Sequence, residues 1–157
     1  MQPVALSLSL SLPDAAATSR LGAALARVSR PGDVYLLRGP LGAGKTTLVD
    51  AFARELGAGA ATSPTFVIAH SYPHGRMPIW HVDLYRLEEP RDVDDLDLAQ
   101  YFSPDAVTLV EWPERRGEAW PADRVEIDLQ VSGESRTAQL TGFGKAAERL
   151  RTLDPHR

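Results

Sequence analysis

The sequence contains no cysteine, only two lysines and no long apolar run, and each absence removes a class of protein. Without cysteine there is no disulfide, no zinc–thiolate site and no cysteine nucleophile, which fits a reducing compartment. No apolar stretch approaches the roughly 20 residues that a transmembrane helix needs. The first residues also lack the basic segment of a signal peptide. We therefore expect a soluble, cytoplasmic protein with no membrane segment.

Basic residues are not concentrated anywhere in the chain. The sequence has 17 Lys and Arg against 21 Asp and Glu, for a formal net charge of −4. Direct electrostatic binding of nucleic acid is therefore not indicated. A length of 157 residues and a hydrophobic content of 43% are typical of one compact domain that combines a sheet with helices. We expect a single domain over residues 1–157.

One glycine-rich stretch fits the phosphate-binding P-loop pattern G-x-x-x-x-G-K-[ST]. Its residues are Gly39, Pro40, Leu41, Gly42, Ala43, Gly44, Lys45, Thr46 and Thr47. In this pattern the glycines let backbone N–H groups surround phosphate oxygens, the lysine brings positive charge to the outer phosphates, and the first threonine ligates Mg²⁺. The pattern predicts a nucleoside triphosphate site. The alternative is a strand-to-helix turn without a ligand.

The residues around this stretch predict the strand, loop and helix that a P-loop requires. Val34–Arg38 is typical of a buried strand, and a helix is expected from Thr46 to about Leu56 with Gly57 as its C-cap. Upstream, the alternating residues 4–12 predict a strand buried on one face. Asp14 is a good N-cap for a helix that extends to about Val28.

Further elements are expected downstream. The pairs Phe66–Ser71 with Ile79–Asp83 and Val125–Val131 with Thr137–Thr141 are predicted antiparallel hairpins. Residues 106–110 predict a buried strand, 88–100 a short acidic helix and 145–153 a terminal helix. The whole predicts one α/β domain of the P-loop NTPase type. Its sheet should be mixed, with a parallel core around residues 34–38 and 107–110, antiparallel additions and helices on both faces.

A P-loop site also needs a carboxylate that holds Mg²⁺ or its waters, usually at the end of a neighbouring strand. Asp83 and Glu111 each follow an apolar strand, so both are candidates. Strand ends are also ordinary surface positions for acidic residues. The spacing does not decide which carboxylate would bind the ion and which would position water.

Three other residues have more than one interpretation. Thr65 either contacts the γ-phosphate or Mg²⁺ from a movable segment or satisfies the local backbone in a turn. His81 shares the strand face of Asp83 and is either a structural hydrogen-bonding residue or a catalytic one. Trp112 belongs to the core, to a wall of the nucleotide site or to a partner contact.

Four motifs together resemble the TsaE family, small bacterial ATPases of tRNA threonylcarbamoyladenosine biosynthesis. Their order and spacing agree with the family from about residue 12 to residue 144. The motifs are the P-loop, Ser63-Pro64-Thr65-Phe66, His81-Val82-Asp83-Leu84-Tyr85-Arg86-Leu87 and Leu109-Val110-Glu111-Trp112-Pro113-Glu114.

The resemblance implies a Mg²⁺-dependent ATPase that works with TsaD and TsaB and supports carbamoyl transfer to the adenosine beside the tRNA anticodon. It also implies roles for individual residues. These are phosphate binding by Lys45, Mg²⁺ ligation by Thr46 and Glu111, assistance of hydrolysis by Asp83, a switch role for Thr65, and nucleotide contacts by Ala15 and Arg136.

Two other function classes are compatible with a P-loop. A small-molecule kinase usually carries an arginine-rich lid over the phosphates, and only Arg115-Arg116 resembles one. A nucleotide-gated binding module would bind the nucleotide without essential hydrolysis. A GTPase is disfavoured, because neither Lys45 nor Lys145 lies in an Asn/Thr-Lys-x-Asp segment that would recognise guanine.

Overall fold

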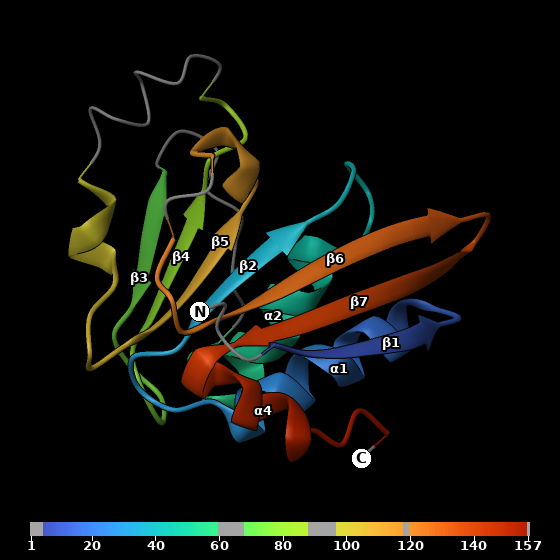
Figure 1. Ribbon diagram of the computed structural model, residues 1–157, viewed down its shortest axis with the longest axis horizontal. Coiled ribbons are helices and arrows are strands. Elements are labelled where there is room, and N and C mark those ends of the chain that lie inside the picture. Colours follow the sequence, from blue (N-terminus) through green and yellow to red (C-terminus); the bar gives the residue numbers. More distant parts are fainter. Residues whose placement is uncertain (1–4, 60–67, 88–96, 118–119, 157) are drawn as a thin grey trace.

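The structure, a computed structural model, describes residues 5–59, 68–87, 97–117 and 120–156. Their strands form one seven-stranded sheet in the order β1-β7-β6-β2-β5-β4-β3 (Figure 1). The strands are β1 (Ala5–Leu12), β2 (Val34–Arg38), β3 (Ala69–Tyr72), β4 (Ile79–Asp83), β5 (Val107–Glu111), β6 (Arg124–Ser132) and β7 (Ser135–Phe143). The helices are α1 (Ala15–Val28), α2 (Lys45–Glu55) and α4 (Ala147–Arg151), with 3₁₀ turns η1 (Leu98–Tyr101), η2 (Pro113–Arg115) and η3 (Gly144–Ala146).

The centre of the sheet is parallel. Strands β4, β5, β2 and β6 pair side by side in parallel, while β3, β7 and β1 pair antiparallel with their neighbours. The predicted mixed sheet is therefore confirmed. Its parallel core is wider than expected, because β6 joins β2 directly. The carboxyl ends of parallel strands meet at one edge, which is where open α/β sheets bind ligands.

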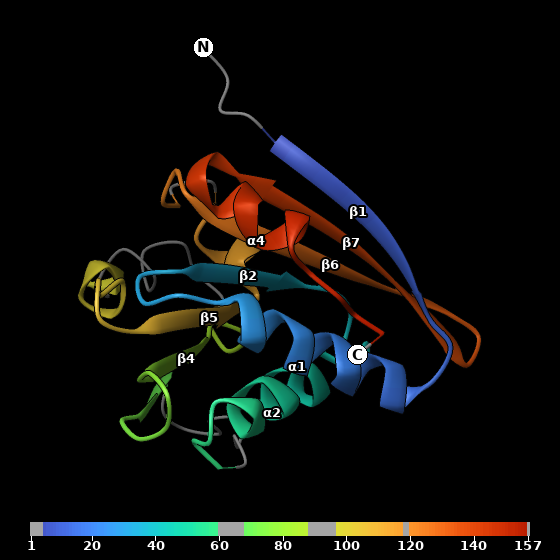
Figure 2. The ribbon, with the colours of Figure 1, turned by 90° about the horizontal axis from the view of Figure 1, so that it is seen from below.

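The two faces of the sheet have separate hydrophobic clusters. Tyr35 and Leu37 of β2 belong to the cluster that α1, α2 and α4 cover, and Figure 2 shows α1 and α2 side by side along this face. Val34 and Leu36 belong to the opposite cluster, where η1 contributes Leu98. This alternation within β2 follows from the period of two along a strand. It confirms that β2 is buried on both faces.

The helix ends follow the predicted capping chemistry. Asp14 is the N-cap of α1, and its side chain accepts a hydrogen bond of 2.8 Å from the backbone N–H of Ala17. Helix α2 ends at a C-cap one residue before Gly57, whose φ of 78° is left-handed. The N–H groups of Gly57 and Ala58 then satisfy the last carbonyl groups of the helix.

Several predicted boundaries differ from the structure. Strand β3 begins at Ala69, and residues 66–67 of the predicted strand lie outside the described residues. The β6–β7 turn contains two residues rather than four, because Ser132 already pairs with Ser135. Residues 88–96 of the predicted acidic helix are also outside the description. The terminal helix is shorter than predicted, since η3 occupies its first turn.

Candidate nucleotide-binding site

The predicted phosphate-binding loop joins the carboxyl end of β2 to the first turn of α2 (Figure 1). Gly44 is the N-cap of α2 and has a left-handed φ of 107°, which is costly for any residue with a Cβ. A Cβ at Gly39 would lie 2.7 Å from the carbonyl oxygen of Leu129 on β6. Gly44 has no side chain that could cap α2. The N-terminus of a helix attracts anions, and this one faces the end of the loop.

A cavity of about 340 Å³ lies over this first turn. Lys45 and Thr46 line it from α2, Asp83 from the end of β4 and Glu111 from the end of β5. Asp83 and Glu111 are direct neighbours in the register of the two parallel strands. The structure therefore brings four of the predicted site residues together at the carboxyl edge of the sheet. Thr65, the predicted switch residue, lies outside the described residues.

Lys45 is buried and held inside the loop. Its Nζ donates a hydrogen bond to the carbonyl oxygen of Gly39 and lies 3.8 Å from the centroid of the Trp112 ring. Burial lowers the pKa of Lys45 below its ordinary value, while nearby carboxylates, first Glu111, act in the opposite direction. A negatively charged ligand would favour the protonated form of this amine.

The two carboxylates have different surroundings. Burial raises the pKa of Asp83 above its ordinary value, an effect that a 3.0 Å hydrogen bond from the backbone N–H of Tyr85 opposes. Glu111 is only 3% exposed, and its Oε2 lies 2.6 Å from Nε2 of His81, which is fully buried. Glu111 is thus fixed by a buried partner, whereas Asp83 is held by backbone at the open end of β4.

Trp112 forms one wall of the cavity. It is the only non-glycine residue with a positive φ, 59°, among the described residues. Its ring packs on Tyr85 at a centroid distance of 4.9 Å. The side chain also contacts the hydrophobic cluster that contains Val34 and Leu36, on the sheet face opposite α1 and α2. Core packing and a role as cavity wall therefore both apply. Tyr85 also lines the cavity, a position that its motif alone did not indicate.

A second cavity of about 210 Å³ lies on the other side of the loop. Ala15, predicted to contact the nucleotide, lines it from the start of α1, and Arg136 lines it from β7. Nη2 of Arg136 donates to the carbonyl oxygen of Gly42 over 3.2 Å. Thr18 and Glu134 also line this cavity and carried no motif that would have identified them. Thr18 lies one helical turn beyond Ala15, so a wheel projection of the helix would have suggested it.

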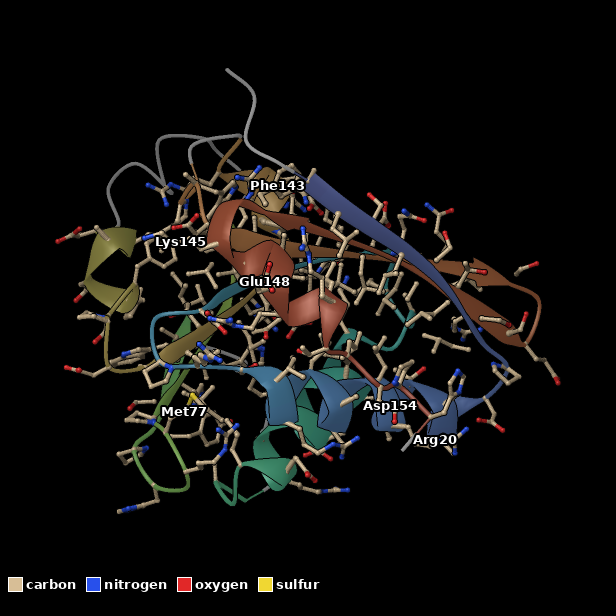
Figure 3. All side chains as sticks on the ribbon, turned by 60° about the horizontal axis from the view of Figure 1, so that its bottom comes forward. Arg20, Met77, Phe143, Lys145, Glu148 and Asp154 are labelled. Atoms are coloured by element: carbon tan, nitrogen blue, oxygen red, sulfur yellow. The ribbon has the colours of Figure 1, made fainter. Side chains whose placement is uncertain are left out.

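Lys145 lies far from the loop. It lies two residues after Phe143, which pairs with Arg124 at the amino end of β6. Because β6 and β2 are parallel, this is the end of the sheet opposite to the one where β2 enters the loop. Figure 3 shows Lys145 beside Phe143 and Glu148 at the start of α4. Because the chain has only two lysines, Lys45 is the lysine of the site. A further cavity of about 400 Å³, between β1, α1 and residues 155–156, lies away from the loop.

The oxygen donors of the first cavity suit Mg²⁺. The hydroxyl of Thr46 and the carboxylates of Asp83 and Glu111 are hard ligands of the kind that Mg²⁺ prefers. Within the described ranges, no group of three or more His, Asp or Glu side chains forms a metal cage. Mg²⁺ usually combines one or two carboxylates with phosphate oxygens and water. The donors therefore fit Mg²⁺ that is held jointly with a nucleotide.

A sequence model of the family described as "Threonylcarbamoyl adenosine biosynthesis protein TsaE" matches residues 12–139. The chain belongs to the TsaE family. A TsaE protein of Bacillus subtilis (strain 168) is 40% identical over 135 residues, which cover 85% of this chain and 84% of the relative. A TsaE protein of Streptomyces coelicolor is 43% identical over 143 residues, which cover 85% of this chain and 94% of the relative.

A solved structure supports the same assignment. The crystal structure of Bacillus subtilis YdiB is 32% identical in sequence and superposes with a TM-score of 0.78 over 94% of this chain and 93% of YdiB. The TsaE resemblance and the α/β fold predicted from the sequence are both confirmed. Among the described residues, this chain has no helix that is long and apolar enough to cross a membrane.

Proposed function

We propose that this TsaE chain binds ATP with Mg²⁺, hydrolyses it and thereby serves tRNA threonylcarbamoyladenosine biosynthesis. The observation that carries the proposal is the meeting of Lys45, Thr46, Asp83 and Glu111 in one cavity at the carboxyl edge of the parallel strands. The relatives that share most of the chain are named as proteins of this pathway, which supports the biological role.

The nucleotide extends across both cavities. They share Gly42, Gly44 and Thr47 in their linings, so the loop is their common floor. The phosphates lie at the N-terminus of α2, where Lys45 leaves the Trp112 ring for the outer phosphates. The adenosine occupies the smaller cavity, between α1 and the β6–β7 turn.

Thr46 and Glu111 hold Mg²⁺ beside the phosphates. When bound, the ion offsets the negative charge of the phosphate oxygens. Without it, the carboxylates of Asp83 and Glu111 would repel a triphosphate, and Lys45 alone would have to balance them. The arrangement of two carboxylates around one lysine is therefore suited to a metal–nucleotide complex rather than to a free nucleotide.

Asp83 assists the attack of water on the γ-phosphorus. The carboxylate orients the water and accepts its proton, the bond between the γ-phosphorus and the bridging oxygen breaks, and ADP and inorganic phosphate are released. The raised pKa of Asp83 makes it a stronger base than an exposed aspartate. Thr65 remains a predicted switch residue.

TsaD and TsaB are the proposed partners, and the mouth of the site supports completion by a protein. Leu41 on the loop is 66% exposed and Tyr85 is 39% exposed beside the same cavity. Exposed apolar side chains around a site are typical of contact surfaces. Phosphoryl transfer depends mostly on positioning and charge neutralisation, which a partner can complete.

The test is phosphate release from Mg-ATP by the purified chain, alone and with TsaD and TsaB. We expect the partners to raise turnover, and Lys45→Ala and Glu111→Ala to lower it by about 100-fold. Lys145→Ala is the matched control, because this lysine lies at the opposite end of the sheet. Unchanged turnover in Lys45→Ala and Glu111→Ala would contradict the proposal.

Two outcomes would replace hydrolysis with another function. Transfer of γ-labelled phosphate from ATP to a metabolite would identify a small-molecule kinase. Full tRNA modification in a complex that contains Asp83→Ala, despite lost phosphate release, would identify a nucleotide-gated binding module.

A further inference from the structure

His81 and Glu111 form a buried pair directly behind the cavity. His81 is 0% exposed and Glu111 is 3% exposed, and the distance from Nε2 to Oε2 is 2.6 Å. They belong to adjacent strands, since β4 and β5 are parallel neighbours. Glu111 nevertheless lines the cavity, whereas His81 does not appear among its lining residues. Within the described residues, His81 thus reaches the cavity through its hydrogen bond to the carboxylate of Glu111.

The hydrogen-bonding state of His81 follows from its second nitrogen. Within the part of the chain that the structure describes, the buried Nδ1 atom has no hydrogen-bond partner. A hydrogen on Nδ1 would therefore be buried without an acceptor, which is unfavourable. We assign the hydrogen to Nε2, which donates to Oε2 of Glu111.

A polar side chain at position 81 is not required for packing. Ile79 lies two residues before His81 on β4, and Leu109 is the neighbour of His81 on β5. Both are apolar and belong to the hydrophobic cluster beneath α1 and α2. An aliphatic residue at position 81 would extend this cluster without an unpaired nitrogen. The imidazole is explained by the carboxylate that it holds.

The backbone of Glu111 is fixed as well. The carbonyl oxygen of Glu111 accepts a hydrogen bond of 3.1 Å from the N–H of Leu84. Glu111 also pairs in register with Leu37 of β2. With the backbone anchored from both neighbouring strands, rotation of the side chain is the remaining freedom of this carboxylate. The hydrogen bond from His81 restricts that rotation.

We propose that His81 is a positioning residue, which holds Oε2 of Glu111 so that Oε1 is presented to the nucleotide-bound divalent cation. The inference rests on the proposed Mg²⁺-dependent function. Groups that hydrogen-bond to a metal-ligating carboxylate fix its orientation, and their loss commonly weakens metal binding about 10–100-fold. His81 acts on cation affinity rather than on nucleotide affinity, because it does not line the cavity.

The test measures the two affinities separately. Binding of Mn²⁺ to the protein–ADP complex is followed by electron paramagnetic resonance of the free ion, and binding of fluorescent ADP is measured in EDTA. His81→Leu should weaken Mn²⁺ binding at least about tenfold while ADP affinity in EDTA changes less than about twofold. His81→Gln, which keeps an N–H donor, should restore Mn²⁺ affinity to within about threefold of wild type.

His70→Gln is the matched control. His70 lies opposite His81 in the β3–β4 register but is only half-buried, and it is not part of the cavity lining. Its substitution should change neither affinity. In hydrolysis, His81→Leu should raise the Mg²⁺ concentration for half-maximal rate about tenfold and leave kcat at saturating Mg²⁺ within about threefold.

The outcomes separate this inference from the proposed function. If Glu111→Gln weakens Mn²⁺ binding but a folded His81→Leu does not, the positioning role is overturned and the metal site stands. If His81→Leu does not fold, His81→Gln decides, since a loss of Mn²⁺ affinity as large as that of Glu111→Gln refutes the donor role. If Glu111→Gln leaves Mn²⁺ affinity unchanged, the proposed metal site fails, and the role of His81 fails with it.

Discussion

The close contact between α1 and α2 at Gly22 connects the packing of the fold to the shape of the site. A Cβ at Gly22 would lie 2.3 Å from the carbonyl oxygen of Leu48 and 3.1 Å from Cβ of Ala51. Helix α1 carries Ala15 in the smaller cavity, and α2 begins with Lys45. Gly22 therefore sets the distance between α1, which lines the proposed adenosine cavity, and α2, whose N-terminus lies at the proposed phosphate site.

Gly22→Ala should force the two helices apart. A 2.3 Å contact must lengthen by about 1 Å to reach the 3.4 Å of an ordinary van der Waals contact. Overpacking against backbone costs about 3 kcal/mol, and the better helix propensity of alanine offsets about 1 kcal/mol. The free energy of unfolding should fall by about 2 kcal/mol, which lowers Tm by about 4–8 °C for a chain of this length.

Thermal unfolding followed by circular dichroism measures this loss, and titration with fluorescent ATP measures the effect on the site. We expect about tenfold weaker ATP binding in Gly22→Ala, a difference of about 1.4 kcal/mol. Arg20→Ala is the control, because Arg20 is exposed on the same helix (Figure 3) and should change stability by less than about 0.5 kcal/mol. A Gly22→Ala protein that melts at or above the wild-type Tm would refute the contact.

Three further predictions concern single residues. ATP should change the tryptophan fluorescence, because Lys45 leaves its position 3.8 Å from the Trp112 ring centroid, and Trp112→Phe should abolish most of that change. As the pH is lowered, phosphate release should be lost at a higher pH than it would be with an exposed aspartate, because burial raises the pKa of Asp83 and the protonated carboxyl group accepts no proton. Asp83→Asn should remove this acidic limb of the pH–kcat profile. Arg149→Ala should lower the free energy of unfolding in urea by about 3 kcal/mol, since Asp33 loses ion-pair contacts of 2.7 and 3.0 Å.

Features that depend on local chemistry were predictable from the sequence. The period of two in residues 5–12, the apolar run of β2 and the capping side chain of Asp14 each act within a few neighbouring residues. The P-loop belongs partly to the same class, because the left-handed φ of Gly44 is a requirement of the loop itself. The close approach of Gly39 to Leu129 of β6 is not local. Asp83 and Glu111, which the motifs singled out, both line the cavity.

Features that depend on distant contacts were not predictable in this way. The pairing of β6 with β2 joins segments far apart in the chain, and nothing in the residues of the β6–β7 hairpin specifies that neighbour. The contact of His81 with Glu111 likewise arises from the parallel register of β4 and β5. Thr18 and Glu134 reach the second cavity only because α1 and the β6–β7 turn flank the loop.

A crystal structure of the chain with Mg²⁺ and a non-hydrolysable ATP analogue would show directly how the two cavities share the nucleotide. We expect the phosphates at the N-terminus of α2 with Lys45 on the outer phosphates. The metal should be bound by Thr46 and Glu111, and the adenosine should lie between Ala15 and Arg136. A nucleotide bound in the cavity between β1 and α1, or a metal bound without Glu111, would contradict this arrangement.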